Sequence, residues 1–293
     1  MFKAYKNVFM QHSATLLFGM LAVFAGNVGQ SFFISWYGAP IQADLNLSAT
    51  SYGSIYSAAT LCSGLAIMAL GGWVDKMPVK RFFTLAMLGL VVACLSLWQV
   101  SGVATLFTGF LLLRFFGQGL LPHTAAVHMG RHFSINRGKA LSVSGLGVPL
   151  GEVILPVLAV YMLTLSHWQQ NWLWIALINL TLILPLGYWL LGHLSPAEDV
   201  SAVDPIVNRD TKPASRRTLL KDLRFWRVLP LVLMPPFAIT GIFIHQSSIL
   251  EGMQWSPSLF ASGFVIYGVL HWLGLSCWHL PVALWCRRIL WCG

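Results

Sequence analysis

Charged residues are scarce in this 293-residue sequence. Asp, Glu, Lys and Arg together make up 9% of it, whereas a soluble domain has roughly a quarter. Hydrophobic residues make up 57%, and the mean hydropathy is +0.71. So few charges cannot cover the surface of a soluble domain of this size. The composition therefore excludes a soluble protein and indicates an integral protein of a lipid bilayer.

Cysteine is also rare, and its spacing is uninformative. The sequence has five cysteines, of which Cys62 and Cys94 stand alone inside apolar runs. None has the spacing to a second Cys or His that a metal or redox site requires. The sequence also contains no nucleophile elbow and no phosphate-binding glycine loop. We therefore expect no metal, no cofactor and no enzymatic activity.

Acidic residues are half as numerous as basic ones, which gives a net charge of +9. This excess would indicate a nucleic-acid partner only if it formed a basic face on a soluble domain. Instead, 17 of the 18 Lys and Arg residues fall in segments on one side of the apolar runs. This distribution follows the positive-inside rule. It predicts a cytoplasmic N-terminus and no nucleic-acid partner, and we expect the protein in the cytoplasmic (inner) membrane of a bacterium.

Long apolar runs dominate the rest of the sequence. A helix needs about 20 apolar residues to cross the hydrocarbon core. Runs of this kind are continuous, unlike the short alternating strands of a membrane barrel, so we expect helices. Eight candidate spans lie near residues 14–39, 52–73, 82–100, 103–127, 140–164, 171–192, 228–249 and 258–280.

A polar segment divides the spans unequally. Residues 193–227 contain three prolines and twelve charged residues, and they predict a cytoplasmic linker. Residues 1–192 would form an N-terminal six-helix bundle, and residues 228–293 a partial C-terminal bundle of about two helices. The last 22 residues contain four Trp, three Cys and no acidic residue. We interpret this tail, from about residue 275, as the mark of a truncated or frameshifted product.

The turn after the second span concentrates charge between two apolar runs. It has the pattern G-x-x-x-D-K-x-P-x-K and resembles the signature loop of the major facilitator superfamily, with Pro78 where the family usually has glycine. The resemblance implies that Gly71, Asp75, Lys76 and Lys80 form a conformational latch between two bundles. Alternatively, the loop only sets the orientation of the chain in the membrane.

The fourth span contains a charge within its apolar run. Its segment LLLRFFGQGLLPHTA is similar to the Arg-containing segment of the same family and includes Arg114 and Gln118. An intramembrane arginine is costly unless it has a partner. Glu152 is the only acidic residue deep within a span, and both residues lie roughly 15–17 Å from the outer surface. We predict an Arg114–Glu152 pair that binds substrate or couples transport to protons; alternatively, the pair only ties two helices together.

The fifth span contains small and helix-bending residues around Glu152. Gly145, Gly147, Pro149 and Gly151 resemble the family's Gly/Pro-rich segment, and they would permit close helix crossing and bending.

Polar residues in two other spans indicate a pathway. In the first span, Asn27 and Gln30 share a helical face with Ser31 and Ser35, and this face would line a polar cavity. In the seventh span, Pro235-Pro236 predicts a break in the helix, which is tolerated only beside protein or water.

The resemblance covers about residues 14–272. It implies an all-α membrane protein with a bundle of six transmembrane helices and about two helices of an incomplete second bundle. The implied function is secondary active transport of a small solute by alternating access, as a proton- or ion-coupled symporter or antiporter. Residues 37–53 and the RFFGQG segment look like the monocarboxylate-porter branch, which would place an organic anion at Arg114.

An alternative function remains open at this point. Transporters of this family usually have about twelve helices. A chain with eight would then be a transport-incompetent truncated fragment or a non-transporting membrane sensor. The sequence leaves the substrate, the coupling ion and the oligomeric state open.

Overall fold

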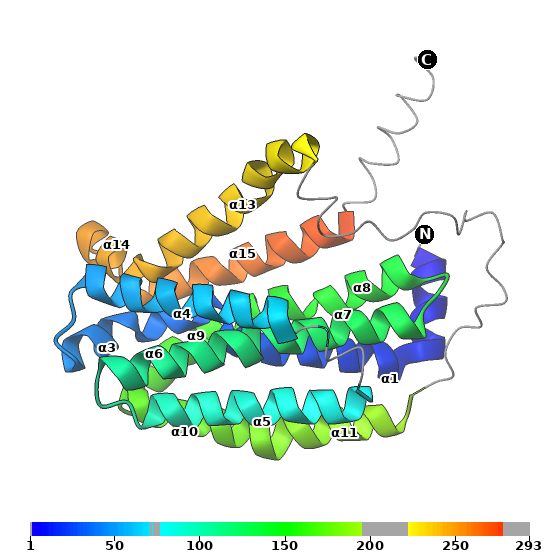
Figure 1. Cartoon of the computed structure of the whole chain (residues 1–293), viewed down its shortest axis with the longest axis horizontal. Coiled ribbons are helices and arrows are strands. Elements are labelled where there is room, and N and C mark those ends of the chain that lie inside the picture. The colour runs from blue at the N-terminus through cyan, green and yellow to red at the C-terminus, as the bar shows by residue number, and fades with distance from the viewer. Residues whose placement is uncertain (1, 71, 73–76, 195–221, 278–293) are drawn as a thin grey trace.

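The computed structural model describes residues 2–70, 72, 77–194 and 222–277, and within these ranges the chain consists of helices and loops without strands (Figure 1). Eight of the described helical stretches are long and apolar enough to cross a membrane. They coincide with the eight predicted apolar runs, which confirms the all-α membrane architecture. Residues 195–221, most of the predicted linker (193–227), and the tail beyond residue 277 lie outside the described residues, whereas residues 223–227 of that prediction belong to a helix.

The first span is not one helix, contrary to the continuous segment predicted over residues 14–39. Gln30 is extended (φ −82°, ψ 149°) and interrupts the helical hydrogen bonding. The resulting elements are α1 (Phe2–Gly26), the 3-10 turn η1 (Asn27–Gly29), α2 (Ser31–Ile34), η2 (Ser35–Tyr37) and α3 (Gly38–Asp44). No proline lies at this break, but Gly26 and Gly29 adjoin it and weaken the helix there.

The next five spans follow the predicted apolar runs closely. The second is α4 (Ala49–Leu70) and the third is α5 (Val79–Trp98). The fourth consists of α6 (Val103–Leu112), the π-helical η4 (Leu113–Leu120) and α7 (Leu121–His132). The fifth is α8 (Arg137–Gly145) with α9 (Gly147–Leu165), and the sixth is α10 (Trp168–Ile178), the π-helical η5 (Asn179–Ile183) and α11 (Leu184–Gly192).

In residues 222–277, the described part of the chain after the linker, there are three helices: α13 (Leu223–Ile244), α14 (Gln246–Met253) and α15 (Pro257–Cys277). The predicted break at Pro235-Pro236 is wrong, because α13 continues through both prolines and the interruption falls at His245. Each proline removes only one backbone donor. The ring of each also crowds the carbonyl four residues earlier in its own helix, which favours a bend and not an end of the helix.

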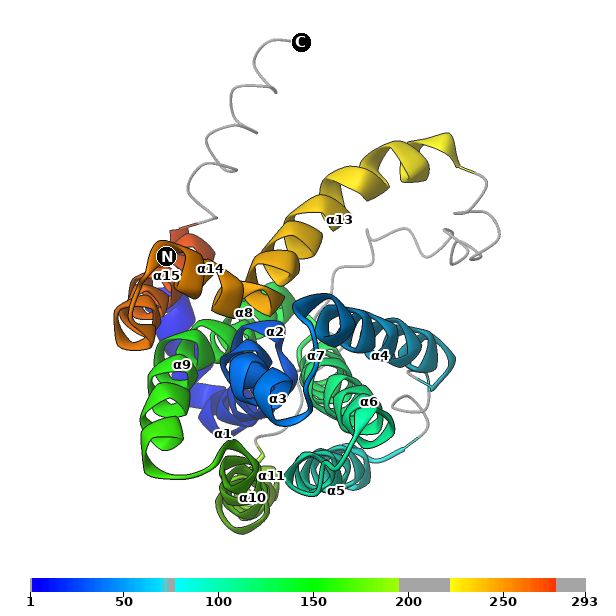
Figure 2. The ribbon, with the colours of Figure 1, turned by 90° about the vertical axis from the view of Figure 1, so that its left-hand side faces the viewer.

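The core lies among the first six spans, and large aromatic side chains fill much of it. The ring of Trp172 on α10 packs against Phe33 and Tyr37 from the broken first span, with ring centroids 5.9 and 4.8 Å apart. From the helices after the linker, the main core cluster includes the buried side chains of Ile244, Ala261 and Phe264. Figure 2 shows α15 beside the bundle and α13 leaning away from it.

Candidate functional site

The break in the first span brings two backbones into direct contact. A Cβ atom on Gly29 would lie 2.4 Å from the carbonyl oxygen of Leu113, and one on Gly117 would lie 2.9 Å from the Cα atom of Gly29. No side chain fits at either position without movement of the backbone. The turn η1 therefore crosses η4 at the closest possible distance, next to Arg114.

Arg114 is buried at this crossing, with 4% of its surface exposed. Its Nη1 donates a hydrogen bond to the carbonyl oxygen of Gly29, 3.1 Å away. The guanidinium also lies over the ring of Tyr56, 5.3 Å from the centroid. Because Gln30 is extended, the Gly29 carbonyl is available to this donor instead of to a helical N–H. A π-helical turn such as η4 is frequent at functional sites.

A cavity of about 830 Å³ lies between α4 and α13, and Arg114 is part of its wall. Its size is within the range of small-molecule sites. The α4 wall is rich in hydroxyl groups, whereas the α13 wall is mostly apolar. The lining residues are Thr50, Gly53, Ser54, Tyr56, Ser57, Thr60, Leu61, Arg114, Pro236, Phe237, Thr240, Gly241, Ile244 and His245.

One buried polar atom at this cavity, Nε of Arg114, has no hydrogen-bond partner among the described residues. A buried polar group without a partner is uncommon, because it costs about 1–3 kcal/mol. The buried hydroxyls of Tyr56 and Thr60 lie close to each other beside it. A cation next to hydroxyl groups makes this region suitable for an anion with several acceptor oxygens.

The sequence analysis missed Tyr56 and Thr60. Their signal is present in the sequence, since Thr50, Ser54, Ser57 and Thr60 recur at spacings of three and four and so share one face of a helix. The predicted polar face of the first span lies elsewhere: the 830 Å³ cavity is not lined by Asn27, Gln30, Ser31 or Ser35.

Asn27 instead joins the first span to the fifth. Its Nδ2 donates hydrogen bonds to the carbonyl oxygens of Gly147 and Val148, at 2.8 and 3.4 Å. A Cβ on Gly151 would meet the side chain of Asn27. Two of the predicted packing glycines, Gly147 and Gly151, therefore lie at a tight crossing, and Pro149 is buried between them.

The other predicted residues of this region are less enclosed. A Cβ atom on Gly145 would meet open space. Gln118 is half-buried on η4, and its backbone nitrogen lies beside Gly29.

The predicted Arg114–Glu152 pair is wrong in this structure. No ion pair joins these residues in the described part of the chain; instead, Oε2 of Glu152 lies 2.7 Å from Nδ1 of His271 on α15. Equal depth in two spans does not fix the direction in which each side chain points. Arg114 faces η1 and α4, whereas Glu152 faces α15. His271 lies in the eighth predicted span, and the sequence analysis does not single it out.

Of the four predicted latch residues, only Lys80 is among the described residues; Gly71, Asp75 and Lys76 lie outside them. The ammonium group of Lys80 lies 4.8 Å from the centroid of the Tyr188 ring on α11. Thr84 donates a hydrogen bond to the Lys80 carbonyl and also contacts the hydroxyl of Tyr188. Lys80 therefore contacts the sixth span of its own bundle.

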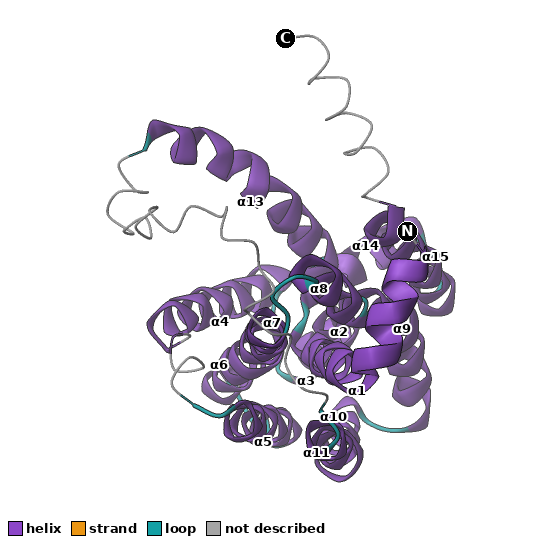
Figure 3. Ribbon diagram, turned by 90° about the vertical axis from the view of Figure 1, so that its right-hand side faces the viewer, coloured by secondary structure: helices purple, strands orange, loops and turns teal. Residues whose placement is uncertain are grey.

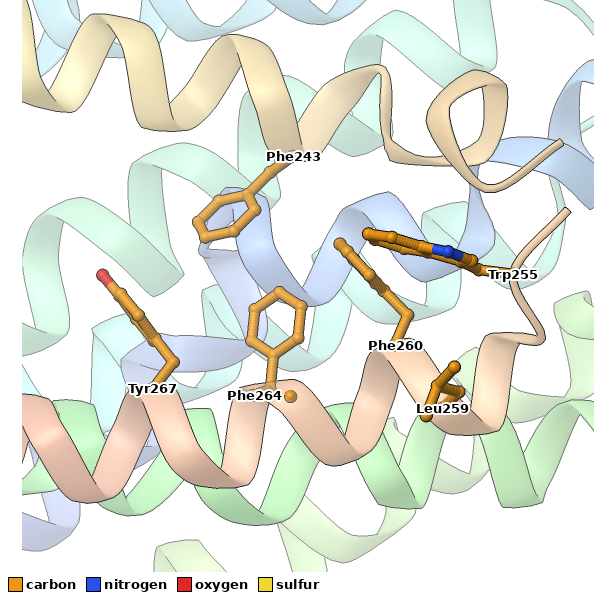
Figure 4. Close-up of a pocket in the computed structure, with 7 residues that line it drawn as sticks. Phe243, Trp255, Leu259, Phe260, Phe264 and Tyr267 are labelled. Atoms are coloured by element: carbon orange, nitrogen blue, oxygen red, sulfur yellow. The ribbon is translucent and has the colours of Figure 1, made fainter. Parts of the chain in front are cut away.

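A second cavity, of about 400 Å³, lies between α13 and α15. Figure 4 shows Phe243 of α13 facing the rings of Phe260 and Phe264, with Trp255 and Tyr267 at the sides. Its lining contains no charged residue, so an anion would find no counter-charge there. Within the described ranges, no three His, Cys, Asp or Glu side chains are placed to hold a metal ion.

Comparison with known proteins agrees with the helical architecture and with the resemblance in the loop after α4. The family model described as Major Facilitator Superfamily matches residues 17–289, which include all eight spans. No curated protein matches the chain significantly. Because the family match covers most of the sequence, the chain belongs to the Major Facilitator Superfamily and is a membrane transporter.

Proposed function

We propose that this protein is a secondary active transporter that moves a small organic anion by alternating access, coupled to protons. The observation that carries the proposal is Arg114, a buried cation on the wall of an 830 Å³ cavity with one guanidinium nitrogen unbonded. We place the protein in the cytoplasmic membrane of a bacterium with its N-terminus in the cytoplasm, because basic residues are confined to one side of the spans.

Binding follows from the chemistry of the cavity walls. A carboxylate at Arg114 would accept a charge-assisted hydrogen bond from the guanidinium, which is about twice as strong as a neutral one. The hydroxyls of Tyr56 and Thr60 would donate to its remaining lone pairs. Pro236, Phe237 and Ile244 of α13 offer an apolar wall to the carbon skeleton of the substrate. A cavity with one polar, cationic wall and one apolar wall suits a small carboxylate. The monocarboxylates that the sequence resemblance implies are of this kind.

Alternating access is supported by the position of the cavity between two parts of the chain. One wall, α4, belongs to the six-span bundle, and the other, α13, follows the linker. A movement of one wall against the other would change the side from which Arg114 is accessible. We assign Asn27, Gln30 and Gln118 to the support of this site around the η1–η4 crossing, and Gly71, Asp75, Lys76 and Lys80 to a latch loop.

Proton coupling is assigned to Glu152. It is a buried carboxylate within a span, and intramembrane carboxylates are frequent members of proton relays. Its contact with His271 places a second proton-exchanging group beside it. The site has no group arranged for covalent chemistry, so we propose transport and not catalysis.

The test is uptake of labelled small mono- and dicarboxylates into proteoliposomes, with and without an imposed pH gradient. We expect the gradient to drive uptake of at least one anion. Arg114→Gln should weaken the apparent affinity by about 10- to 100-fold, because it removes a charged hydrogen-bond donor. Glu152→Gln should leave exchange at equal pH on both sides but abolish the effect of the gradient.

Arg81→Gln is the matched control, since Arg81 is exposed and the substitution removes the same charge. If no anion enters, or if Arg114→Gln and Arg81→Gln behave alike, the proposal is wrong. Absence of uptake for every anion would favour the non-transporting alternative.

A further inference from the structure

The contact between α9 and α15 joins the six-span bundle to the helices after the linker. Figures 2 and 3 both show the two helices side by side. A Cβ on Gly268 would lie 2.7 Å from Cγ2 of Val153 and 3.0 Å from the carbonyl oxygen of Pro149. Gly268 of α15 therefore packs directly against the side chain of Val153 and the backbone of α9, which brings the two helices close together.

One polar contact lies in this apolar joint. Oε2 of Glu152 is 2.7 Å from Nδ1 of His271, and the side chain of Glu152 is only 6% exposed while that of His271 is 32% exposed. A buried carboxylate is costly unless it is paired or protonated. His271 is therefore the group that makes burial of Glu152 against α15 favourable.

Few other titratable groups face this pair. Tyr267, one turn before His271 on α15, interacts with Glu152, and its ring centroid lies 6.1 Å from that of His271. The helices α2 and α10, which also pack on α9, have no titratable residue. The titratable residues of α1 and α8 lie toward the N-terminal ends of these helices. The turn η2, which also packs on α9, has one titratable residue, Tyr37. The pair thus has no third charge in contact with it among the described residues.

The number of protons on the pair determines its net charge. With one proton, either as carboxylate and imidazolium or as carboxylic acid and imidazole, the pair is neutral and strongly hydrogen-bonded. Without a proton, the pair leaves a net negative charge on a buried carboxylate, which is unfavourable. Separation of α15 from α9 would expose that charge to water. The closed joint therefore binds one proton more tightly than the open joint does.

We propose that Glu152 and His271 form a one-proton site that holds α15 against α9 when occupied and releases it when empty. His271 is a positioning residue, since it acts through Glu152. The link of this site to substrate movement rests on the proposed transport function, whereas the proton-controlled contact does not. By linkage, the joint is closed at acidic pH and opens as the pH rises and the proton leaves.

The distance between α9 and α15 tests this directly. Val157 and Ile266 are exposed on the two helices and can carry nitroxide labels as Val157→Cys and Ile266→Cys, in the full chain with its five native cysteines replaced by alanine. Pulsed electron paramagnetic resonance in liposomes would measure the distance distribution between pH 5 and pH 9. We expect a single short distance at acidic pH and a longer-distance population that grows with pH.

Two variants separate a proton site from a structural contact. Glu152→Gln cannot carry a negative charge, so the short distance should persist at alkaline pH, where the parent opens. His271→Gln keeps a hydrogen-bonding side chain but cannot hold the proton, so the opening should move to lower pH. The Tyr267→Phe variant should respond like the parent.

A distance distribution that does not change with pH in the parent would overturn the proposal, as would a Glu152→Gln variant that still opens. A pH response of the expected kind without uptake of any anion would instead contradict the transport function and leave the proton site intact.

Discussion

The first and third spans of the six-span group before the linker are packed very differently from the seventh span, in the group after it. In the first and third spans, 61% and 56% of the residues are buried, against 6% in the seventh, whereas the second and the eighth are alike at 17%. The centre of the first group thus owes its arrangement to contacts within that group, whereas the second group touches it mainly through α15 and the end of α13. Both proposed functional contacts, the Arg114 cavity and the Glu152–His271 pair, lie where these two groups meet. This difference suggests a rigid bundle against which the later helices move.

The largest expected effect is on the stability of the fold, when a leucine is shortened to alanine in the six-span group and, for comparison, in the helices after the linker. Leu97 on α5 is fully buried, and Leu231 on α13 is 74% exposed. We expect Leu97→Ala to destabilise the fold by about 2–5 kcal/mol because it leaves a cavity. Leu231→Ala should change stability by less than about 0.5 kcal/mol. Thermal unfolding in detergent measures both, and equal effects would mean that the two groups are packed alike.

A smaller effect is expected from adding a methyl group to a glycine. Gly29→Ala would place its Cβ against the Leu113 carbonyl, while a Cβ on Gly241 of α13 meets nothing within 4 Å. We expect the first substitution to cost about 1–3 kcal/mol through displacement of η1 from η4. It should also weaken anion uptake, because the Gly29 carbonyl positions Arg114. Gly241→Ala should be neutral in the stability assay, whereas destabilisation by Gly241→Ala alone would reverse the comparison.

The smallest effect concerns the Thr84–Tyr188 contact between α5 and α11, which is internal to the first group. Thr84→Val should cost about 0.5–1.5 kcal/mol, the usual net value of one hydrogen bond. Thr181→Val is the control, because the Thr181 hydroxyl is exposed and bonds only to the Leu177 carbonyl of its own helix. Urea or detergent titration would compare them, and a larger loss for Thr181→Val would contradict the assignment.

The number and approximate limits of the spans could be predicted from the sequence because continuous apolar runs reflect the thickness of the bilayer. The family could also be recognised, because the loop after α4 and the Arg114 segment are local patterns. Residues such as Gly147 and Gly151 were predicted at a close helix crossing since small side chains have few other uses inside a membrane.

Other features depend on how the helices are turned and paired, which the sequence does not state. The break at Gln30 follows Gly26 and Gly29, but glycine within a helix does not by itself predict a break, and this one accompanies the contact of η1 with η4. Glu152 was assigned to Arg114 by depth alone, yet rotation of α9 directs it to His271. The reverse holds for Pro235-Pro236, where a strong local signal predicted a break but α13 continues.

The central claim is that an organic anion binds at Arg114 between α4 and α13. Ser57 lines this cavity, so Ser57→Cys can be labelled with a neutral thiol reagent in the chain with its five native cysteines replaced by alanine. Ser262→Cys on α15, exposed and outside the cavity lining, is the control.

We expect small monocarboxylates such as pyruvate to slow labelling of Ser57→Cys but not of Ser262→Cys, and Arg114→Gln to abolish this protection. Labelling of Ser57→Cys that no organic anion slows, or protection that persists in Arg114→Gln, would contradict the account.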